Sequence, residues 1–493
     1  MSEKREFFSS RWGLLAASLG CAIGVGNIWR FPRIAAENGG GAFLVPWILF
    51  LFIWSIPLII AEYSLGRKTR EGVVGTFATF GKSNKAWMGA FIALVASAVL
   101  FYYAVIVGWC VYYFLLSLKG TFTSNGLTPG EAKQLFLSFA GTPVTIFYQA
   151  IPLLICGGII YNGGVKGIER LNEVLIPALF VLLVIAAIRA CTLPGAGEGI
   201  RYLFVPRWEY LTSYKTWIEA LAQSAWSTGA GFGLFLTYAV YVGKKQDIVA
   251  NSLFTAVGNN IASIIAALAV IPTVFAILPT KEANEALSAG SVGLTFFWLP
   301  ELFAKMPLGW LFSTLFFITL VFAGLSSLIS LVELPTRVIM DFGVPRKKAV
   351  TVVVAVSFAL GIPSALSLNF LDNQDYVWGK GLILSGLMFA VLIIRYGAPA
   401  FRKHLLDKEE DMEVGSWFDY AIVYLVPLQV LLMMGWWFYR AVKDLPDWWN
   451  PVAVQSIGTS VMQWGLAIGL FAALNRFLKE KVVPTAQNSD TDG

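Results

Sequence analysis

Residues 20–38 read GCAIGVGNIWRFPRIAAEN, a series of helix-breaking residues inside an otherwise apolar segment. Gly20, Gly24 and Gly26, followed by Asn27, Arg30 and Pro32, interrupt a run that is apolar from Trp12 to Leu19 and again from Ala42 onward. In a bilayer, backbone N–H and C=O groups need partners within the protein, so irregular backbone persists there only where it is buried or lines a cavity. A helix broken near the membrane midplane is typical of ion and substrate sites in secondary transporters, although glycines also allow ordinary close helix packing.

The composition indicates an all-α polytopic membrane protein. Of the 493 residues, 57% are apolar and only 13% are charged, whereas soluble proteins average about 25% charged residues. A span takes about 20 apolar residues, and the recurring runs predict twelve transmembrane helices: 12–37, 41–66, 88–117, 143–161, 168–189, 212–242, 248–278, 308–341, 348–368, 376–398, 416–439 and 452–477. No small-residue cleavage pattern follows the short charged N-terminus, so we expect no cleavable signal peptide.

The positions of the basic residues predict the orientation. With both termini inside, the cytoplasmic loops hold most of the 36 Lys and Arg residues, including the clusters 67–70, 244–245, 346–348 and 402–403, as the positive-inside rule requires. We therefore expect a multi-pass protein of the cell (inner or plasma) membrane with both termini cytoplasmic. The net charge of +6 is accounted for by loops that face an anionic leaflet, so no nucleic-acid partner is implied.

Side chains suited to catalysis or to soft metals are scarce. His404, the only histidine, lies in a predicted cytoplasmic loop, and the four cysteines lie in or beside predicted spans. Only Cys191 is near a predicted external loop, so we expect no external disulfide. Without a His/Cys cluster, a nucleophile–base pair or a phosphate-binding loop, the chain is not expected to be an enzyme. No obligate protein partner is implied.

The sixth predicted span repeats the interruption of the first. From Gln223 the chain reads QSAWSTGAGFGLFLTYAVYV, with glycines at positions 229, 231 and 233. Two broken spans, five apart, are expected if spans 1–5 (12–189) and spans 6–10 (212–398) form two inverted repeats with the site between them. Spans 11 and 12 (416–477) lie outside the repeats, within a single transporter domain covering 1–493. The alternative is a flexible glycine patch in a packing helix.

Other polar side chains lie within the predicted spans: Tyr102, Tyr103, Asn259, Asn260, Ser263, Ser326 and Ser327. Amide and hydroxyl oxygens are hard ligands that suit small cations. Taken singly, each has a simpler explanation, because a serine can bond its own helix backbone and an asparagine can join two helices.

In combination, these segments resemble the neurotransmitter:sodium symporter family, with the LeuT fold. The resemblance covers spans one to ten in order and rests on the segments GVGNIWRFP, ENGGGAFLVPW, FYYAVIVGW, GAGFG, VGNNIAS, VGLTFFWLPELF, FAGLSS and LDNQD. It implies a LeuT fold with a 5+5 inverted repeat and broken helices 1 and 6. It also implies a sodium-coupled secondary active symporter that imports a small substrate by alternating access.

The resemblance implies two sodium ions bound at the helix breaks. The first would use the Ala22 carbonyl, the Asn27 amide, Ser227 and the Asn259 amide, with the substrate carboxylate as a further ligand. The second would use the following carbonyl and hydroxyl groups: Gly20, Ile23, Ala323, Ser326 and Ser327. A carboxylate shared between ion and substrate would couple the two binding events.

The resemblance places the substrate at the same helix ends, where free N–H groups suit a carboxylate. Backbone at Val25 and Gly26 and the Tyr103 hydroxyl would hold that carboxylate. The amino group would face carbonyls of Ala22, Trp226 and Ser227. The side-chain pocket would be lined by Val99, Trp226, Gly229, Phe232, Ser327 and Leu331.

Several positions depart from the family's patterns. Amine-transporting members carry an aspartate where this chain has Gly24, so the substrate should bring its own carboxylate. Gly229 and Trp226 replace a serine and a phenylalanine of the bacterial amino-acid transporters, and Cys21 replaces a polar amide. We therefore expect an amino-acid-like substrate, most simply a neutral hydrophobic amino acid, with a betaine, an N-methylated or a β-amino acid as the alternative.

Two charge pairs match the family's gates. Arg30 with Asp375 would close the external side, and Arg5 with Asp341 would close the internal side, where Phe8 replaces a familiar tryptophan. The alternative for Arg5 is a topology charge.

The resemblance also bears on whether the protein binds chloride, because members of the family differ in this property. Chloride-independent bacterial members carry a glutamate where this chain has Ser263, so Gln223, Ser227, Asn259 and Ser263 could cage a Cl⁻ ion. Against this, Trp47 replaces a tyrosine that helps to bind chloride in the family.

Overall fold

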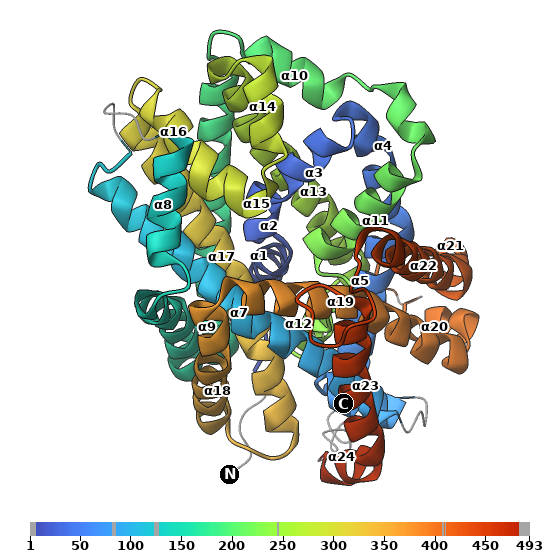
Figure 1. Ribbon diagram of the computed structural model, residues 1–493. Coiled ribbons are helices and arrows are strands. Elements are labelled where there is room, and N and C mark those ends of the chain that lie inside the picture. The colour runs from blue at the N-terminus through green and yellow to red at the C-terminus, as the bar shows by residue number, and fades with distance from the viewer. Residues whose placement is uncertain are drawn as a thin grey trace.

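The computed structural model describes residues 6–80, 85–122, 128–243, 246–406, 409 and 411–482. Within these residues the chain folds into helices joined by short loops, and its only β-type pairing is an isolated bridge between Gly40 and Pro206. Figure 1 shows the N-terminal end at one side of the helical bundle and α10 (Ala196–Phe204), α14 (Thr280–Leu287) and α16 (Leu299–Ala304) at the opposite side. The first is called the N-terminal side below.

Among the described residues, eight helices are each long and apolar enough to cross a membrane. They are Gly41–Thr69 (α4 Gly41–Phe50, η1 Leu51–Ser55 and α5 Ile56–Thr69), α7 Ala86–Leu118, α9 Pro143–Cys191, α13 Ile248–Ile277, α17 Gly309–Asp341, α18 Arg346–Leu366, α19 Leu368–Tyr396 and Trp417–Asp444 (α21 Trp417–Tyr420, η5 Ala421–Leu425 and α22 Val426–Asp444). Two bent pairs raise the number to ten: α1 Arg11–Ala22 with Val25–Glu37 (α2 and α3), bent by 56°, and α23 Ile457–Ala473 with α24 Asn475–Lys481, bent by 58°.

The difference between ten and the twelve predicted spans has two physical sources. Helix α9 has 49 residues and a non-helical Gly164 at φ 53°; at 1.5 Å per residue it is about 74 Å long, enough to cross a bilayer twice. It contains both predicted spans 143–161 and 168–189. The predicted span 212–242 is split into α11 (Tyr214–Thr228) and α12 (Leu234–Ala239), each too short to count alone. The segments are therefore consistent with twelve spans.

Shorter helices connect the long ones. Beside α10, α14 and α16, they are α6 Val73–Thr79, α8 Pro129–Phe139, α15 Gly290–Val292, α20 Ala398–Leu405, the 3-10 turn η3 Trp208–Thr212 and the π-helical turn η4 Gly293–Trp298. Helix α8 begins with a capping box, in which the Glu131 N–H donates to Thr128 Oγ1 (3.3 Å) and the Glu131 carboxylate accepts from the Thr128 N–H (2.8 Å). The Thr128 N–H and the Thr128 hydroxyl both donate to the Glu131 carboxylate and hold its pKa below the usual value.

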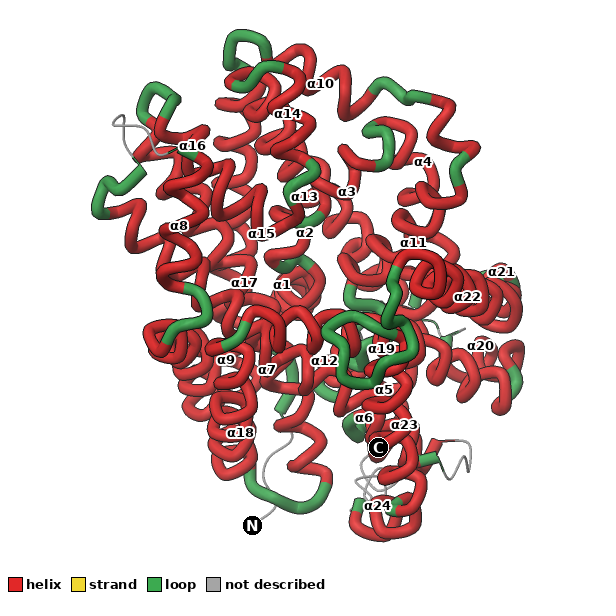
Figure 2. The backbone as a smooth tube through the Cα atoms, in the orientation of Figure 1, coloured by secondary structure: helices red, strands yellow, loops and turns green. Residues whose placement is uncertain are grey.

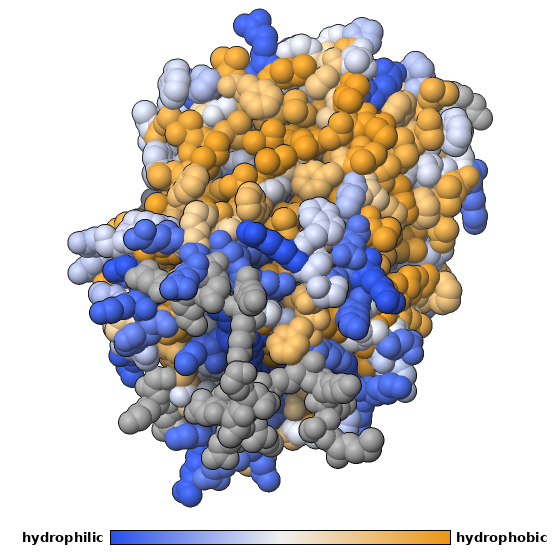
Figure 3. Space-filling view, turned by 180° about the vertical axis from the view of Figure 1, so that it is seen from behind, coloured by the Kyte–Doolittle hydropathy of each residue, from blue (hydrophilic) through white to orange (hydrophobic). Residues whose placement is uncertain are grey.

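The outer surface is apolar over much of its height. Figure 3 shows a broad hydrophobic area on one face, with hydrophilic residues gathered toward the lower end and at the top. Exposed large side chains such as Phe147, Leu154 and Val174 on α9 and Leu431 on α22 contribute to the apolar exterior. An exterior of this kind matches a chain surrounded by lipid.

Helices α7 and α17 pack closely against each other in the core. A Cβ built on Gly324 of α17 would lie 2.9 Å from both methyl carbons of Val107 on α7. The absence of a side chain therefore lets the two helices approach, as is common between membrane helices.

Both predicted helix breaks are present in the middle of the molecule, where Figure 2 shows loop backbone between α1 and α2 and between α11 and α12. In the second break Gly229, Gly231 and Gly233 have φ values of 68°, 95° and 81°, a region that glycine adopts without strain. Glu62 of α5, completely buried, accepts hydrogen bonds from the N–H groups of Gly231 (2.6 Å), Phe235 (3.1 Å) and Leu236 (3.2 Å). One carboxylate thus satisfies three backbone donors that the break releases.

This arrangement predicts that Glu62→Gln destabilises the second break, because an amide NH₂ would face backbone donors. Each buried donor left without a partner costs about 1–3 kcal/mol. Thermal unfolding of the purified protein in detergent measures the loss. The exposed ion pair Arg476–Glu480 offers the matched control: Glu480→Gln should leave the midpoint unchanged, and equal midpoints for both variants would contradict this role of Glu62.

Candidate functional site

At the first break, the N-terminal end of the short helix α2 (Val25–Trp29) meets a side chain of its own and one from α7. The Gly24 N–H donates to Asn27 Oδ1 (3.0 Å), and the Val25 N–H donates to the Tyr103 hydroxyl of α7 (3.1 Å). Val25 and Tyr103, both predicted to hold a substrate carboxylate, are therefore in direct contact. The Tyr103 hydroxyl thus accepts the hydrogen bond of the Val25 N–H, the donor predicted to bind the substrate carboxylate.

A cluster of oxygen atoms lies between the two breaks and α13. One end of the Asn259 amide is 2.9 Å from the Ser227 carbonyl oxygen and 3.3 Å from the Ala22 carbonyl oxygen. The two carbonyls alone would favour the amide NH₂ at this end, as a donor to both, whereas the Asn27 Nδ2 donor 2.7 Å away favours the amide oxygen there. Oxygens of three residues then face one another without a proton between them, an arrangement that a small cation stabilises.

The structure thus brings together all four residues predicted for the first sodium site, but it turns one of them. The oxygen of the Asn27 amide accepts the Gly24 N–H, and its nitrogen faces the cluster. Coordination by this oxygen would require the amide to rotate. Asn27 Nδ2 also donates to Ser227 Oγ (3.1 Å) and Ser263 Oγ (2.8 Å).

A second oxygen cluster joins α1 to α17. Ser327 Oγ lies 3.1 Å from the Gly20 carbonyl oxygen and 3.3 Å from that of Ile23. Ser326 Oγ lies 3.4 Å from the Ile23 carbonyl oxygen and 3.0 Å from that of Ala323. All five residues predicted for the second sodium site therefore converge, from segments about 300 positions apart. The simpler expectation, serines bonded only to their own helix, does not describe this pair.

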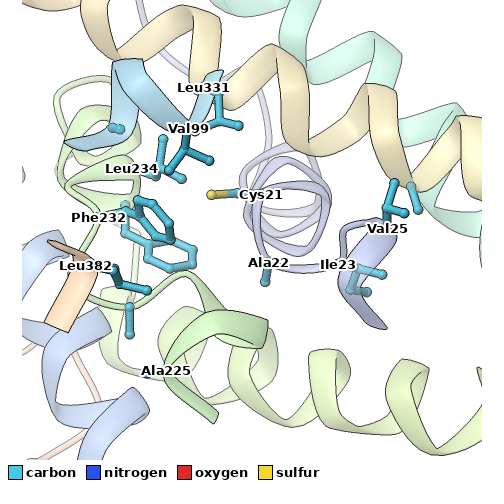
Figure 4. Close-up of a cluster of buried hydrophobic side chains, with 14 of the residues drawn as sticks. Cys21, Ala22, Ile23, Val25, Val99, Ala225, Phe232, Leu234, Leu331 and Leu382 are labelled. Atoms are coloured by element: carbon cyan, nitrogen blue, oxygen red, sulfur yellow. The ribbon is translucent and has the colours of Figure 1, made fainter. Parts of the chain in front are cut away.

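A cavity of about 520 Å³ lies beside the breaks. Ten of the eleven residues predicted to contact substrate line it, namely Ala22, Gly26, Val99, Tyr103, Trp226, Ser227, Gly229, Phe232, Ser327 and Leu331; the other, Val25, lies behind Tyr103. Figure 4 shows side chains of Val99, Leu234, Leu331 and Phe232 gathered near Cys21, on one side of the chain that turns at Ala22. This side of the cavity wall is apolar.

At its far end the cavity is bordered by charged side chains. Arg30, Asp375, Asp372 and Lys380 line it, and both aspartates are exposed. Arg30 and Asp375, the predicted external gate, form no ion pair here; the guanidinium lies over the Trp226 ring, 5.8 Å from its centroid. Lys380, which was not predicted to border the site, places its ammonium 3.4 Å from the centroid of the Tyr376 ring. The sequence feature that could have identified Lys380 is that it places a charge inside the predicted span 376–398.

On the N-terminal side the route from the breaks is sealed. Phe8, 5% exposed, packs edge-on against Tyr238 with ring centroids 5.7 Å apart, and its N–H donates to the Tyr241 carbonyl (3.1 Å). Arg346 pairs with Glu333 (2.8 Å) and with Glu6 (2.9 Å). The structure therefore has a closed N-terminal side and a cavity that reaches exposed residues on the opposite side.

Of the two residues predicted to form the inner gate, only Asp341 lies within the described residues. Asp341 accepts from the Gly72 N–H (2.6 Å) and pairs with Arg337 (2.7 Å). Arg5, its predicted partner, lies outside the described residues, so this pairing stays a prediction.

The residues predicted for chloride lie in mixed surroundings. Ser263 Oγ donates to the Asn259 carbonyl (3.1 Å) and accepts from Asn27, which ties it to the first oxygen cluster. Gln223 Oε1 and Trp47 Nε1 are buried and have no hydrogen-bond partner within the described residues. An unpartnered buried donor such as this indole N–H is costly unless a further group satisfies it.

These features define an integral membrane protein in which the residues predicted to bind ions and substrate meet at two broken helices. The chain belongs to the sodium:neurotransmitter symporter family, whose model matches residues 5–126 and 141–479. It is thus a sodium-dependent transporter of the LeuT fold, in a family of transporters rather than enzymes.

Individual relatives agree with this assignment. An uncharacterised sodium-dependent transporter of Methanocaldococcus jannaschii is 32% identical over 440 residues, which cover 86% of this chain and 89% of that protein. The sodium- and chloride-dependent taurine transporter of Rattus norvegicus is 26% identical, over 94% of this chain and 82% of that protein. The crystal structure of MhsT in complex with L-phenylalanine superposes with a TM-score of 0.76 at 32% identity, covering 88% of this chain and 99% of that one.

Proposed function

We propose that the protein imports a neutral hydrophobic amino acid together with Na⁺ by alternating access. The observation that carries the proposal is the first oxygen cluster, where the Asn259 amide faces the Ala22 and Ser227 carbonyls directly beside the apolar cavity. A cation held there would lie next to the place of the substrate carboxylate, so ion and substrate would stabilise each other.

Two cotransported Na⁺ ions fit the two clusters. Both clusters consist of neutral carbonyl, amide and hydroxyl oxygens, the ligands that hard cations prefer. Because the first cluster lacks a carboxylate of its own, the substrate would supply the anionic ligand. The second cluster joins α1 to α17, so an ion there would hold the broken helix against an unbroken one.

The substrate class follows from the space at the first break. A Cβ at Gly24 would lie 2.9 Å from Ser327 Oγ and 3.1 Å from the Tyr103 hydroxyl oxygen, which leaves little room for the aspartate that an amine substrate would need. The apolar wall of Val99, Phe232 and Leu331 suits a hydrophobic side chain. MhsT, crystallised with L-phenylalanine, supports this class. A quaternary ammonium of a betaine would need the Trp226 face, where Arg30 already lies.

The remaining topology completes the proposed transport cycle. We place the N-terminal side in the cytoplasm of the cell (plasma or inner) membrane, and segments 12–189 and 212–398 as the two inverted repeats. Each repeat then supplies one broken helix at the same depth. Arg30 would pair with Asp375 when the external side closes, and Asp341 with Arg5 on the inner side.

Uptake into proteoliposomes tests the proposal. An inward Na⁺ gradient should drive accumulation of labelled leucine or phenylalanine, and replacing Na⁺ by choline should abolish it. Decarboxylated analogues should compete about 100-fold more weakly or worse, because buried donors lose a charged partner. Serotonin- or dopamine-like amines should not compete. Tight competition by such an amine, with leucine and phenylalanine inert, would overturn the substrate class.

The first cluster predicts linked losses. Asn27→Leu and Asn259→Leu should each weaken Na⁺ and substrate affinity by about tenfold or more, because each removes a group next to the Ala22 and Ser227 carbonyls. Titration calorimetry at several Na⁺ concentrations measures both affinities. Asn162→Leu, which alters an exposed amide bonded to Gly158, is the control. A substrate affinity that keeps its Na⁺ dependence in both variants would refute the site.

We also propose a chloride ion beside Ser263, held with help from Gln223, Ser227 and Asn259. Ser227, Asn259 and Ser263 all accept hydrogen bonds from Asn27 Nδ2, so three of the four proposed ligands lie together. The anion would offset the charge of the two Na⁺ ions.

Ser263→Glu tests the chloride proposal, because the new carboxylate would supply the negative charge in place. Wild-type uptake should fall several-fold when gluconate replaces chloride, whereas the variant should be indifferent. Ser263→Ala should stay chloride-sensitive or lose activity. If the wild type itself does not respond to chloride, Trp47 has abolished the site.

A further inference from the structure

The indole of Trp226 packs directly against Gly379 in α19. A Cβ built on Gly379 would lie 2.4 Å from Cζ2, 3.2 Å from Cη2 and 3.4 Å from Cε2 of the indole. Real Cβ atoms do not approach a ring this closely, and the ring is too stiff to yield without moving as a whole. Both residues line the cavity of about 520 Å³. The indole can therefore occupy its place only while position 379 lacks a side chain.

The backbone at Gly379 does not itself require glycine. The residue lies inside the helix Leu368–Tyr396 and is not among the glycines with positive φ. Glycine inside a helix lowers stability relative to alanine. Since no conformational need explains it here, its role is to leave room for the neighbouring ring.

The indole is confined on its other sides as well. The Arg30 guanidinium lies over its face, 5.8 Å from the centroid, and Phe232 meets it edge-on, with centroids 6.0 Å apart at 73°. A ring pushed away from α19 would move toward the cavity that these residues border. Figure 4 shows Phe232 beside Val99, Leu331 and Leu234, the apolar residues that face this space.

We propose that Gly379 is a specificity-determining residue: it sets how far the Trp226 indole withdraws from the cavity, and so the largest substrate side chain that fits. The inference rests on the proposed function, because it takes Trp226 to border the substrate side chain. Gly379 acts through Trp226 and does not itself need to touch the substrate.

The test is Gly379→Ala, assayed by competition of alanine, valine, leucine, phenylalanine and tryptophan against Na⁺-driven uptake. We expect phenylalanine and tryptophan to lose at least tenfold more apparent affinity than alanine and valine. Trp226→Phe added to this variant should restore the large substrates, because the smaller ring leaves room for the new methyl group. Gly435→Ala, in α22 where a Cβ meets nothing within 4 Å, is the matched control. An equal loss for all five amino acids, or no rescue by the second substitution, would overturn the proposal.

A second measurement does not depend on transport. Cys21 lines the same cavity, Cys110 and Cys156 are fully buried, and Cys191 can be replaced by serine. Labelling of Cys21 by a small methanethiosulfonate reagent should slow several-fold in Gly379→Ala and recover in the double variant. Unchanged labelling in both variants would contradict displacement of the indole. If the wild type transports no amino acid, the proposed function fails, while the labelling still decides whether Gly379 positions Trp226.

Discussion

The structure depends on how the backbone of two interrupted membrane helices finds hydrogen-bond partners. At the second break the buried carboxylate of Glu62 accepts three N–H groups; at the first, the Asn27 amide and the Tyr103 hydroxyl accept two. These acceptors satisfy the donors, but the carbonyls of Ala22 and Ser227 are left facing the Asn259 amide. A bilayer interior tolerates such backbone only when something completes it. The groups predicted to bind ion and substrate thus arise from the same interruption.

The two ends of the molecule are closed by different physical means. On the N-terminal side, Arg346 and Glu333 form a buried pair with side chains 7% and 0% exposed, next to the packed ring of Phe8. A buried pair is costly to break, because each partner would be left charged and unpaired. On the opposite side Asp375 is exposed and unpaired with Arg30, and exposed pairs contribute little energy. The N-terminal side is therefore the harder of the two to open. A transporter that opens each side in turn needs the free energy of ligand binding to offset the cost of breaking the buried pair.

Much of the site could be predicted from local sequence, because helix-breaking residues and residues with oxygen-bearing side chains are neighbours in the segments GVGNIWRFP, STGAGFG and FAGLSS. Serines 326 and 327 lie where predicted, against Gly20 and Ile23. The partners that lie far apart in sequence could not be predicted. Glu62 was one acid in a predicted span, and its donors lie 169 to 174 positions away. The Trp226–Gly379 contact joins two spans that no motif links. The closed N-terminal side and the cavity that reaches exposed residues on the opposite side could not be predicted either, because they depend on contacts between elements far apart in sequence.

The central claim is that Na⁺ and substrate bind as linked neighbours at the paired helix breaks. Calorimetric titration of the wild-type protein tests it most directly, with leucine titrated at low and at saturating Na⁺, and Na⁺ titrated without and with saturating leucine. The account predicts that each ligand tightens the other by the same factor, about 5–150-fold. A leucine affinity that is independent of Na⁺ would contradict it.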